Sequence, residues 1–65
     1  MTTAELLTHI EGARIKADVV PHYAKAIRDR TIDWPTVNKA IMARWSMSAL
    51  YDIKQAAWKI VEGKA

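Results

Sequence analysis

Apolar residues recur at spacings of three and four along almost the whole 65-residue chain, and this spacing is typical of helices that bury one side. No segment alternates apolar and polar residues as a half-buried strand does, and only two glycines and two prolines interrupt the chain. The sequence therefore predicts a single all-α domain over residues 1–65. We expect a small bundle of three or four short helices, at about 3–19, 21–29, 34–45 and 46–62.

Capping residues suggest where these helices begin and end. Thr2 or Thr3 is placed to cap the first helix, because a hydroxyl oxygen accepts a hydrogen bond from the free backbone N–H groups of the first turn. Asp33 and Ser46 are expected to cap the third and fourth helices in the same way. Gly63 is placed to end the last one.

The first half of the chain carries a heptad-like apolar seam that Pro21 interrupts. We expect two helices, with Pro21 in the first turn of the second, but the phase is preserved and a single helix kinked at Pro21 is the alternative. Gly12 lowers helix propensity and marks either a close helix approach or a tolerated defect. The seam consists of Leu6, Ile10, Ala13, Ala17, Val20, Ala24 and Ile27.

A surplus of apolar surface lies on the predicted fourth helix. Its apolar residues cover an arc of roughly 220°, whereas an ordinary surface helix shows a stripe closer to ~100° wide. The arc is broken only by Lys54, and Leu50, Ile53 and Ala57 lie at its centre, where we expect the core contacts. A cysteine-free chain of this size has no disulfide or thiolate metal site, which leaves oligomerisation or very good helix packing to stabilise it. The surplus apolar surface favours a homodimer or another protein partner. The predicted anchors are Met47, Tyr51 and Trp58, with Trp34 as a further candidate.

Positive charge is concentrated between residues 14 and 44, in a chain of formal net charge +3. Within this region, residues 23–41 resemble the helix-turn-helix DNA-binding proteins. Their recognition half has an apolar residue, a capping residue, a Thr-Val-Ser-Arg segment and an apolar pair. The matching residues here are Ile32, Asp33, Thr36-Val37-Asn38-Lys39 and Ala40-Ile41, preceded by Tyr23, Ala24 and Ile27 in the place of the first helix. The turn is about three residues longer than the usual tight one and contains no glycine.

The resemblance implies a small DNA-binding or transcription-regulatory protein that acts on double-stranded DNA. Thr36, Asn38 and Lys39 would contact base edges in the major groove. The implied phosphate contacts are Lys25, Arg28, Arg30 and Arg44.

Simpler interpretations of the same residues remain open. In these interpretations, the cations are an ordinary solvated surface, and residues 36–39 belong to an amphipathic helix without further function. Trp34, Ile41 and Trp45 lie on one side of the predicted third helix and suit a core. The helix-turn-helix interpretation leaves Trp34 and Asn38 exposed, whereas the packing interpretation buries Trp34.

Catalytic patterns are lacking in the sequence. Neither His9 nor His22 has a nucleophile or carboxylate at a spacing that suits a catalytic pair, and no glycine-rich loop is present. We therefore expect a protein that is not an enzyme and needs no cofactor or metal. The start resembles no signal peptide, and no apolar run approaches the ~18 residues of a membrane span, so a cytoplasmic protein without membrane contact is expected. The main alternative to DNA binding is a small protein-binding module: an inhibitor, accessory subunit or assembly factor.

Overall fold

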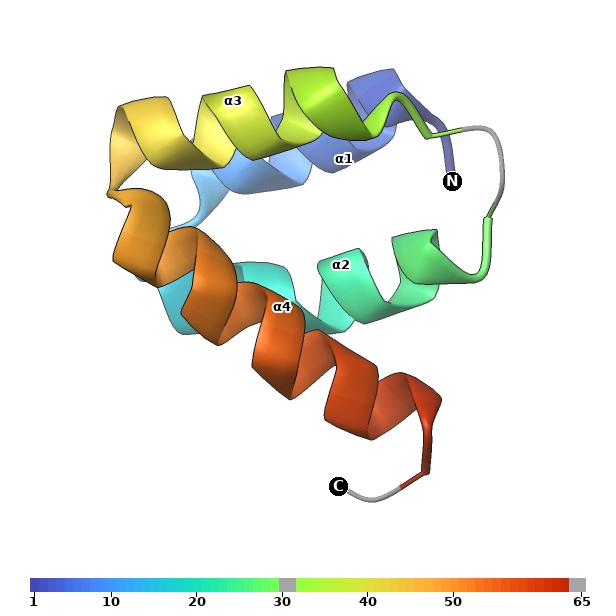
Figure 1. The fold of residues 1–65 in the computed structure, drawn as a ribbon. Helices are drawn as coiled ribbons and strands as arrows, with labels where there is room; N and C mark the ends of the chain where they lie inside the picture. Colours follow the sequence, from blue (N-terminus) through green and yellow to red (C-terminus); the bar gives the residue numbers. More distant parts are fainter. Residues whose placement is uncertain (30–31, 64–65) are drawn as a thin grey trace.

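A computed structural model describes residues 1–29 and 32–63 and confirms the all-α fold, with no strand in that part of the chain. Its four α-helices and one short 3-10 helix follow one another with short connections (Figure 1). They are α1 (Thr3–Gly12), the 3-10 helix η1 (Lys16–Val19), α2 (Val20–Ile27), α3 (Trp34–Arg44) and α4 (Met47–Val61). None of these helices is long and apolar enough to cross a membrane.

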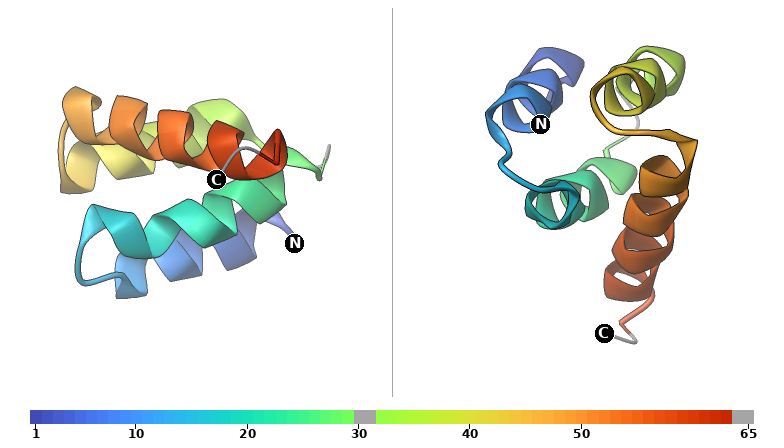
Figure 2. Two further views of the ribbon diagram at one scale, coloured as in Figure 1. Left: turned by 90° about the horizontal axis from the view of Figure 1, so that it is seen from below. Right: turned by 90° about the vertical axis from the view of Figure 1, so that its left-hand side faces the viewer.

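The helices form two layers. α1 and α3 lie side by side in one layer, and α2 lies under them, as the end-on view in Figure 2 shows. α4 leaves α3 at a tight turn and runs beside α2, which is its main packing partner. The last turns of α4 project away from the α1–α3 layer (Figure 1).

The predicted first helix of residues 3–19 is wrong, because α1 ends at Gly12. The Asp18 carboxylate accepts hydrogen bonds from the backbone N–H groups of Arg14 at 3.1 Å and Ile15 at 3.4 Å, and these bonds hold a turn in place of a further helical turn. A single helix kinked at Pro21 is excluded for the same reason. Ala17, which the seam placed on the buried side, is exposed.

Gly12 does not mark a close helix approach. A Cβ atom built at this position meets no atom within 4 Å, so the residue faces open space as the last residue of α1. Pro21 lies in the first turn of α2, as predicted, where its missing N–H group would have had no helical partner.

The other helix ends agree with the capping residues, with one difference. Thr2 Oγ1 accepts from the Glu5 N–H at 3.2 Å, and Ser46 Oγ accepts from the Ala49 N–H at 3.2 Å. Gly63 follows α4 with a φ of 76°, a left-handed conformation that glycine adopts without strain. Asp33 occupies the N-cap position of α3, but its carboxylate accepts from the Thr36 hydroxyl at 2.8 Å and no cap bond to a backbone N–H forms.

The core lies where the two layers meet. α4 contributes Leu50, Ile53 and Ala57, the residues that the sequence placed at the centre of its apolar arc. The other helices and the connections contribute Leu6, Ile10, Ala13, Val19, Tyr23, Ala24, Ala26, Ile32, Val37 and Ile41.

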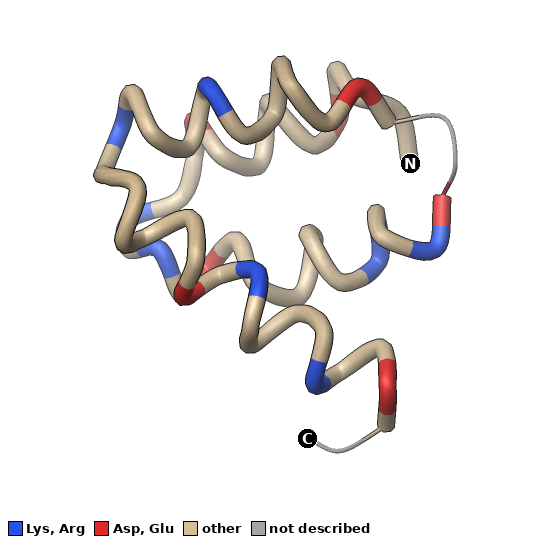
Figure 3. The backbone as a smooth tube through the Cα atoms, in the orientation of Figure 1, with Lys and Arg blue, Asp and Glu red and all other residues tan. Residues whose placement is uncertain are grey.

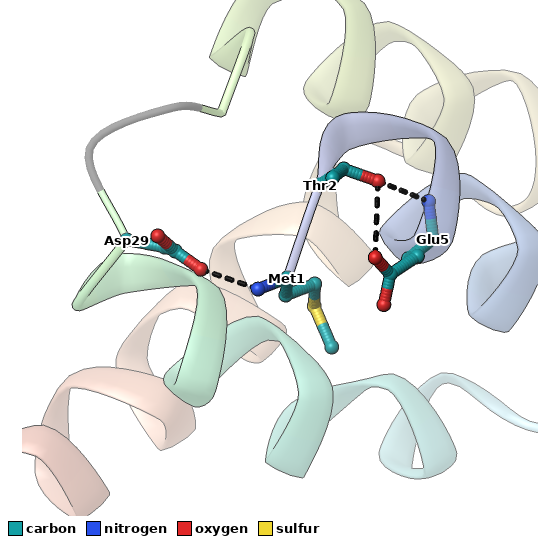
Figure 4. A network of polar contacts seen from close by, with 4 residues as sticks. All are labelled: Met1, Thr2, Glu5 and Asp29. Carbon is teal, nitrogen blue, oxygen red and sulfur yellow. Dashed lines mark hydrogen bonds and ion pairs between the residues drawn. The ribbon is translucent and has the colours of Figure 1, made fainter.

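An ion pair ties the start of the chain to the end of α2. The Met1 ammonium group lies 2.5 Å from the Asp29 carboxylate, and Thr2 and Glu5 form their own hydrogen bonds at the start of α1 (Figure 4).

Candidate functional site

α4 is packed on one side and open on the other. Ala49, Leu50, Ile53 and Ala57 are buried against the rest of the domain. Next to this buried side, the exposed fractions are 59% for Met47, 57% for Tyr51 and 47% for Trp58. The wide apolar arc predicted from the sequence therefore divides into a buried half and an uncovered half.

These three exposed residues and the half-buried Lys54 form a line, which we call the α4 stripe: Met47, Tyr51, Lys54 and Trp58. At about 100° per residue, these four positions lie within an arc of roughly 60° on the helix. The stripe extends over about 16 Å along the helix axis, since each residue adds ~1.5 Å. Its C-terminal half, Lys54 and Trp58, borders a groove.

The groove has a volume of about 320 Å³ and lies between α2, the start of α3 and α4. A volume of this size is at the lower end for ligand-binding pockets, and it accommodates one or two protruding side chains. Its lining is mainly aromatic and aliphatic, with one amide and one ammonium group: Tyr23, Ile27, Trp34, Asn38, Lys54 and Trp58.

Tyr23 fixes one wall of this groove. Its hydroxyl donates a hydrogen bond to Asn38 Oδ1 at 3.2 Å, and its ring lies 4.9 Å from the Trp34 ring, centroid to centroid, at a tilt of 44°. Burial raises the pKa of the Tyr23 hydroxyl to about 12, so the group stays a neutral donor over the physiological range. The start of α3 is thereby held against α2.

The burial of Trp34 and Asn38 agrees in part with each of the two interpretations of α3. Asn38 is half-buried and turned towards Tyr23, and Trp34 is half-buried as well. Each interpretation is therefore correct only in part. Ile41 is fully buried, and Trp45 is half-buried at the turn into α4.

The predicted DNA contacts do not gather on one face. Lys25 lies on α2 and Arg28 directly follows it, whereas Thr36 and Lys39 are exposed on α3, in the other layer. Figure 3 shows basic positions spread over both layers. Arg30 lies outside the described residues.

Arg44, another predicted phosphate contact, is engaged within the domain. Its guanidinium group donates to the Ile10 carbonyl and lies 4.7 Å from the centre of the Trp45 ring. α2 packs mainly against α4, and α3 packs against α1 and α4. The two helices of the resemblance thus meet through Tyr23, and they do not form a closely packed pair.

A second cluster joins α1 to α2. The rings of His9 and His22 stack with their centroids 3.7 Å apart and their planes 7° from parallel. Burial lowers the pKa of His22, and the neighbouring charges of His9 and Lys25 lower it further. Among the described residues, no group of three or more His, Cys, Asp or Glu side chains is arranged to hold a metal ion.

The sequence predicted the exposed anchors but not the groove. Tyr23 and Ile27 were assigned to a helix pair, and Lys54 was noted only as an interruption of the apolar arc. The spacing of residues 47, 51, 54 and 58 was the available indication that Lys54 shares a line with the three anchors.

The chain matches no protein-family model, no curated protein and no solved structure.

Proposed function

We propose that this domain is a non-enzymatic binding module that recognises another protein through the α4 stripe. The observation that supports it is the exposure of Met47, Tyr51 and Trp58 in one line, on a helix that Leu50, Ile53 and Ala57 already anchor to the core along the adjacent side. Contiguous apolar surface of this kind marks interaction sites on folded domains, whereas isolated exposed apolar residues carry no such meaning.

The residue types also suit an interface. Tryptophan and tyrosine are enriched among the residues that contribute most to binding, and methionine adapts its shape to a partner. The stripe is carried by a 15-residue helix that the core already holds in place. Little ordering entropy is lost when such a surface binds, so more of the gain from apolar burial appears as affinity.

Photo-cross-linking tests this proposal. A photoreactive amino acid replaces Tyr51 in the cells that produce the protein, and a matched variant carries it at Lys39, which is exposed in the other layer. We expect a discrete protein adduct from position 51 that is absent from position 39, and binding of that protein after purification. The absence of an adduct at position 51 both in cells and in concentrated purified protein, or the same adducts from both positions, would contradict the proposal.

DNA binding is a second candidate function. The observation that favours it is that Lys25, Arg28 and Lys39 are exposed and form no ion pair with a described residue. If they contact phosphates, the affinity for random duplex DNA falls with salt, with a slope of about 0.9 in log affinity against log salt for each contact.

Fluorescence anisotropy at two salt concentrations measures this slope. Lys25→Gln combined with Arg28→Gln should lower it by up to about 2. Lys59→Gln, which removes a charge from α4, serves as the control. No binding at low salt with tens of micromolar protein would end the DNA hypothesis.

A further inference from the structure

The α4 stripe has the same spacing in both directions along the helix. Its positions 47, 51, 54 and 58 are separated by four, three and four residues, so the pattern is symmetric about the midpoint between residues 52 and 53. A two-fold symmetric interface needs a surface that complements itself. We propose that the stripe binds a second copy of this chain, with the two α4 helices antiparallel; this inference rests on the proposed function and names its partner.

The antiparallel arrangement gives every residue of the stripe a suitable neighbour. Met47 lies opposite Trp58 of the second copy, and a thioether beside an aromatic ring is a favourable contact. Lys54 lies opposite Tyr51, where the ammonium group is attracted to the face of the ring. A parallel arrangement would instead place Lys54 against Lys54 and align the two helix dipoles, and both effects are unfavourable.

The groove adds a second complementary feature. Met47 is the most exposed large apolar residue of α4, and it lies at one end of the stripe. Trp58 lies at the other end and lines the groove together with Trp34. In the antiparallel pair, the Met47 side chain of each copy therefore lies at the groove of the other copy. Measured along the helix, Met47 and Trp58 are each about 8 Å from the two-fold axis, so the two positions coincide.

The size of the contact sets the concentration at which it forms. A standard interface buries ~800 Å² on each partner, roughly a fifth of the 4345 Å² surface of this domain. A contact along one 15-residue helix is smaller than this. We therefore expect a weak dimer that is populated only in concentrated solution.

Sedimentation equilibrium and the indole N–H signals of the three tryptophans test the pairing without any added ligand. From tens of micromolar to millimolar protein, the mass should rise towards twice that of the monomer, and the signals of Trp34 and Trp58 should shift. The signal of Trp45, at the other end of α3, should move least. Met47→Gln should weaken association at least tenfold, whereas Ile15→Gln, an exposed residue outside the stripe, should leave it unchanged.

A spin label decides the orientation. Ser48→Cys introduces a single attachment site beside the stripe, because the chain has no cysteine of its own. Labelled protein is mixed with isotope-enriched unlabelled protein, so that only contacts between copies broaden the observed signals. In the antiparallel pair, Trp58 should broaden more than Trp45, because position 48 of one copy lies opposite position 57 of the other.

Three results would overturn the inference: a monomer at every concentration, broadening of Trp45 in preference to Trp58, or association that Met47→Gln does not weaken. A monomer that still gives a cross-link to a different protein from position 51 would end this inference and leave the proposed function standing. The absence of both would contradict the two together.

Discussion

The hydroxyl of Tyr23 donates a hydrogen bond to Asn38 Oδ1 at 3.2 Å and thereby joins α2 to the start of α3. Because Tyr23 is only 2% exposed, this bond is shielded from competing water. The same ring lies against Trp34, so one residue positions two members of the groove lining. The groove is therefore built into the fold and does not depend on a partner to form it.

Tyr23→Phe should destabilise the domain. The substitution removes the hydroxyl donor and leaves the half-buried side-chain oxygen of Asn38, Oδ1, without this hydrogen bond. The loss should lower the free energy of unfolding by about 1–3 kcal/mol. Urea denaturation followed by circular dichroism measures the loss. Tyr51→Phe removes the same atom from an exposed ring and should change the stability by less than about 0.5 kcal/mol. Equal effects of the two substitutions would show that the buried hydrogen bond contributes nothing.

The His9–His22 stack should make stability depend on pH. The pKa of His22 in the folded state lies below its ordinary value of 6.5, so the unfolded chain binds this proton more tightly. The stabilising contribution of neutral His22 is complete above pH 6.5 and is lost as the pH falls through the lowered folded-state pKa. The melting temperature should therefore fall between pH 7 and pH 5, and His22→Gln should flatten this dependence.

An NMR titration of the His22 ring checks the cause. Its midpoint should lie below 6.5, and His9→Gln should raise it only in part, because burial is the largest of the three causes that lower this pKa. A midpoint at or above 6.5 in the unmodified protein would contradict the stacked arrangement.

Leu50 should be one of the residues on which folding depends most. It is 6% exposed at the centre of the buried side of α4, and removal of a buried leucine side chain costs about 2–5 kcal/mol. A domain with roughly 5 kcal/mol of total stability would then be largely unfolded. Thermal denaturation of Leu50→Ala measures this, with Ile15→Ala as an exposed control. A shift of only one or two degrees would exclude Leu50 from the core.

The periodicity of apolar residues was enough to predict the fold class and most of the helices. The bounds of α3 and α4 were predicted to within one or two residues. This precision came from Pro35, Ser46 and Gly63, which mark the helix ends through local backbone chemistry. Leu50 and Ile53 were identified as core because they lie at the centre of the apolar arc, and that argument needs no knowledge of the tertiary structure.

The turn after α1 was not predictable from the same periodicity. The apolar seam keeps its phase through residues 13–20, whether or not the backbone continues as a helix. The Asp18 carboxylate stabilises the turn that follows α1, because it accepts hydrogen bonds from the backbone N–H groups of Arg14 and Ile15. The groove escaped prediction for a related reason: it combines residues of three helices, whose relative placement depends on packing between layers.

A double substitution tests most directly whether the α4 stripe serves binding, as proposed, and not folding. Met47→Gln with Tyr51→Gln keeps residues of good helix propensity and removes two exposed anchors. Isothermal titration calorimetry with the protein that cross-links from position 51, or dilution calorimetry if that protein is a second copy, measures the affinity. We predict an affinity at least about 30-fold lower, corresponding to ~2 kcal/mol, with an unchanged melting temperature. An unchanged affinity, or a melting temperature lowered as far as in Leu50→Ala, would contradict the claim.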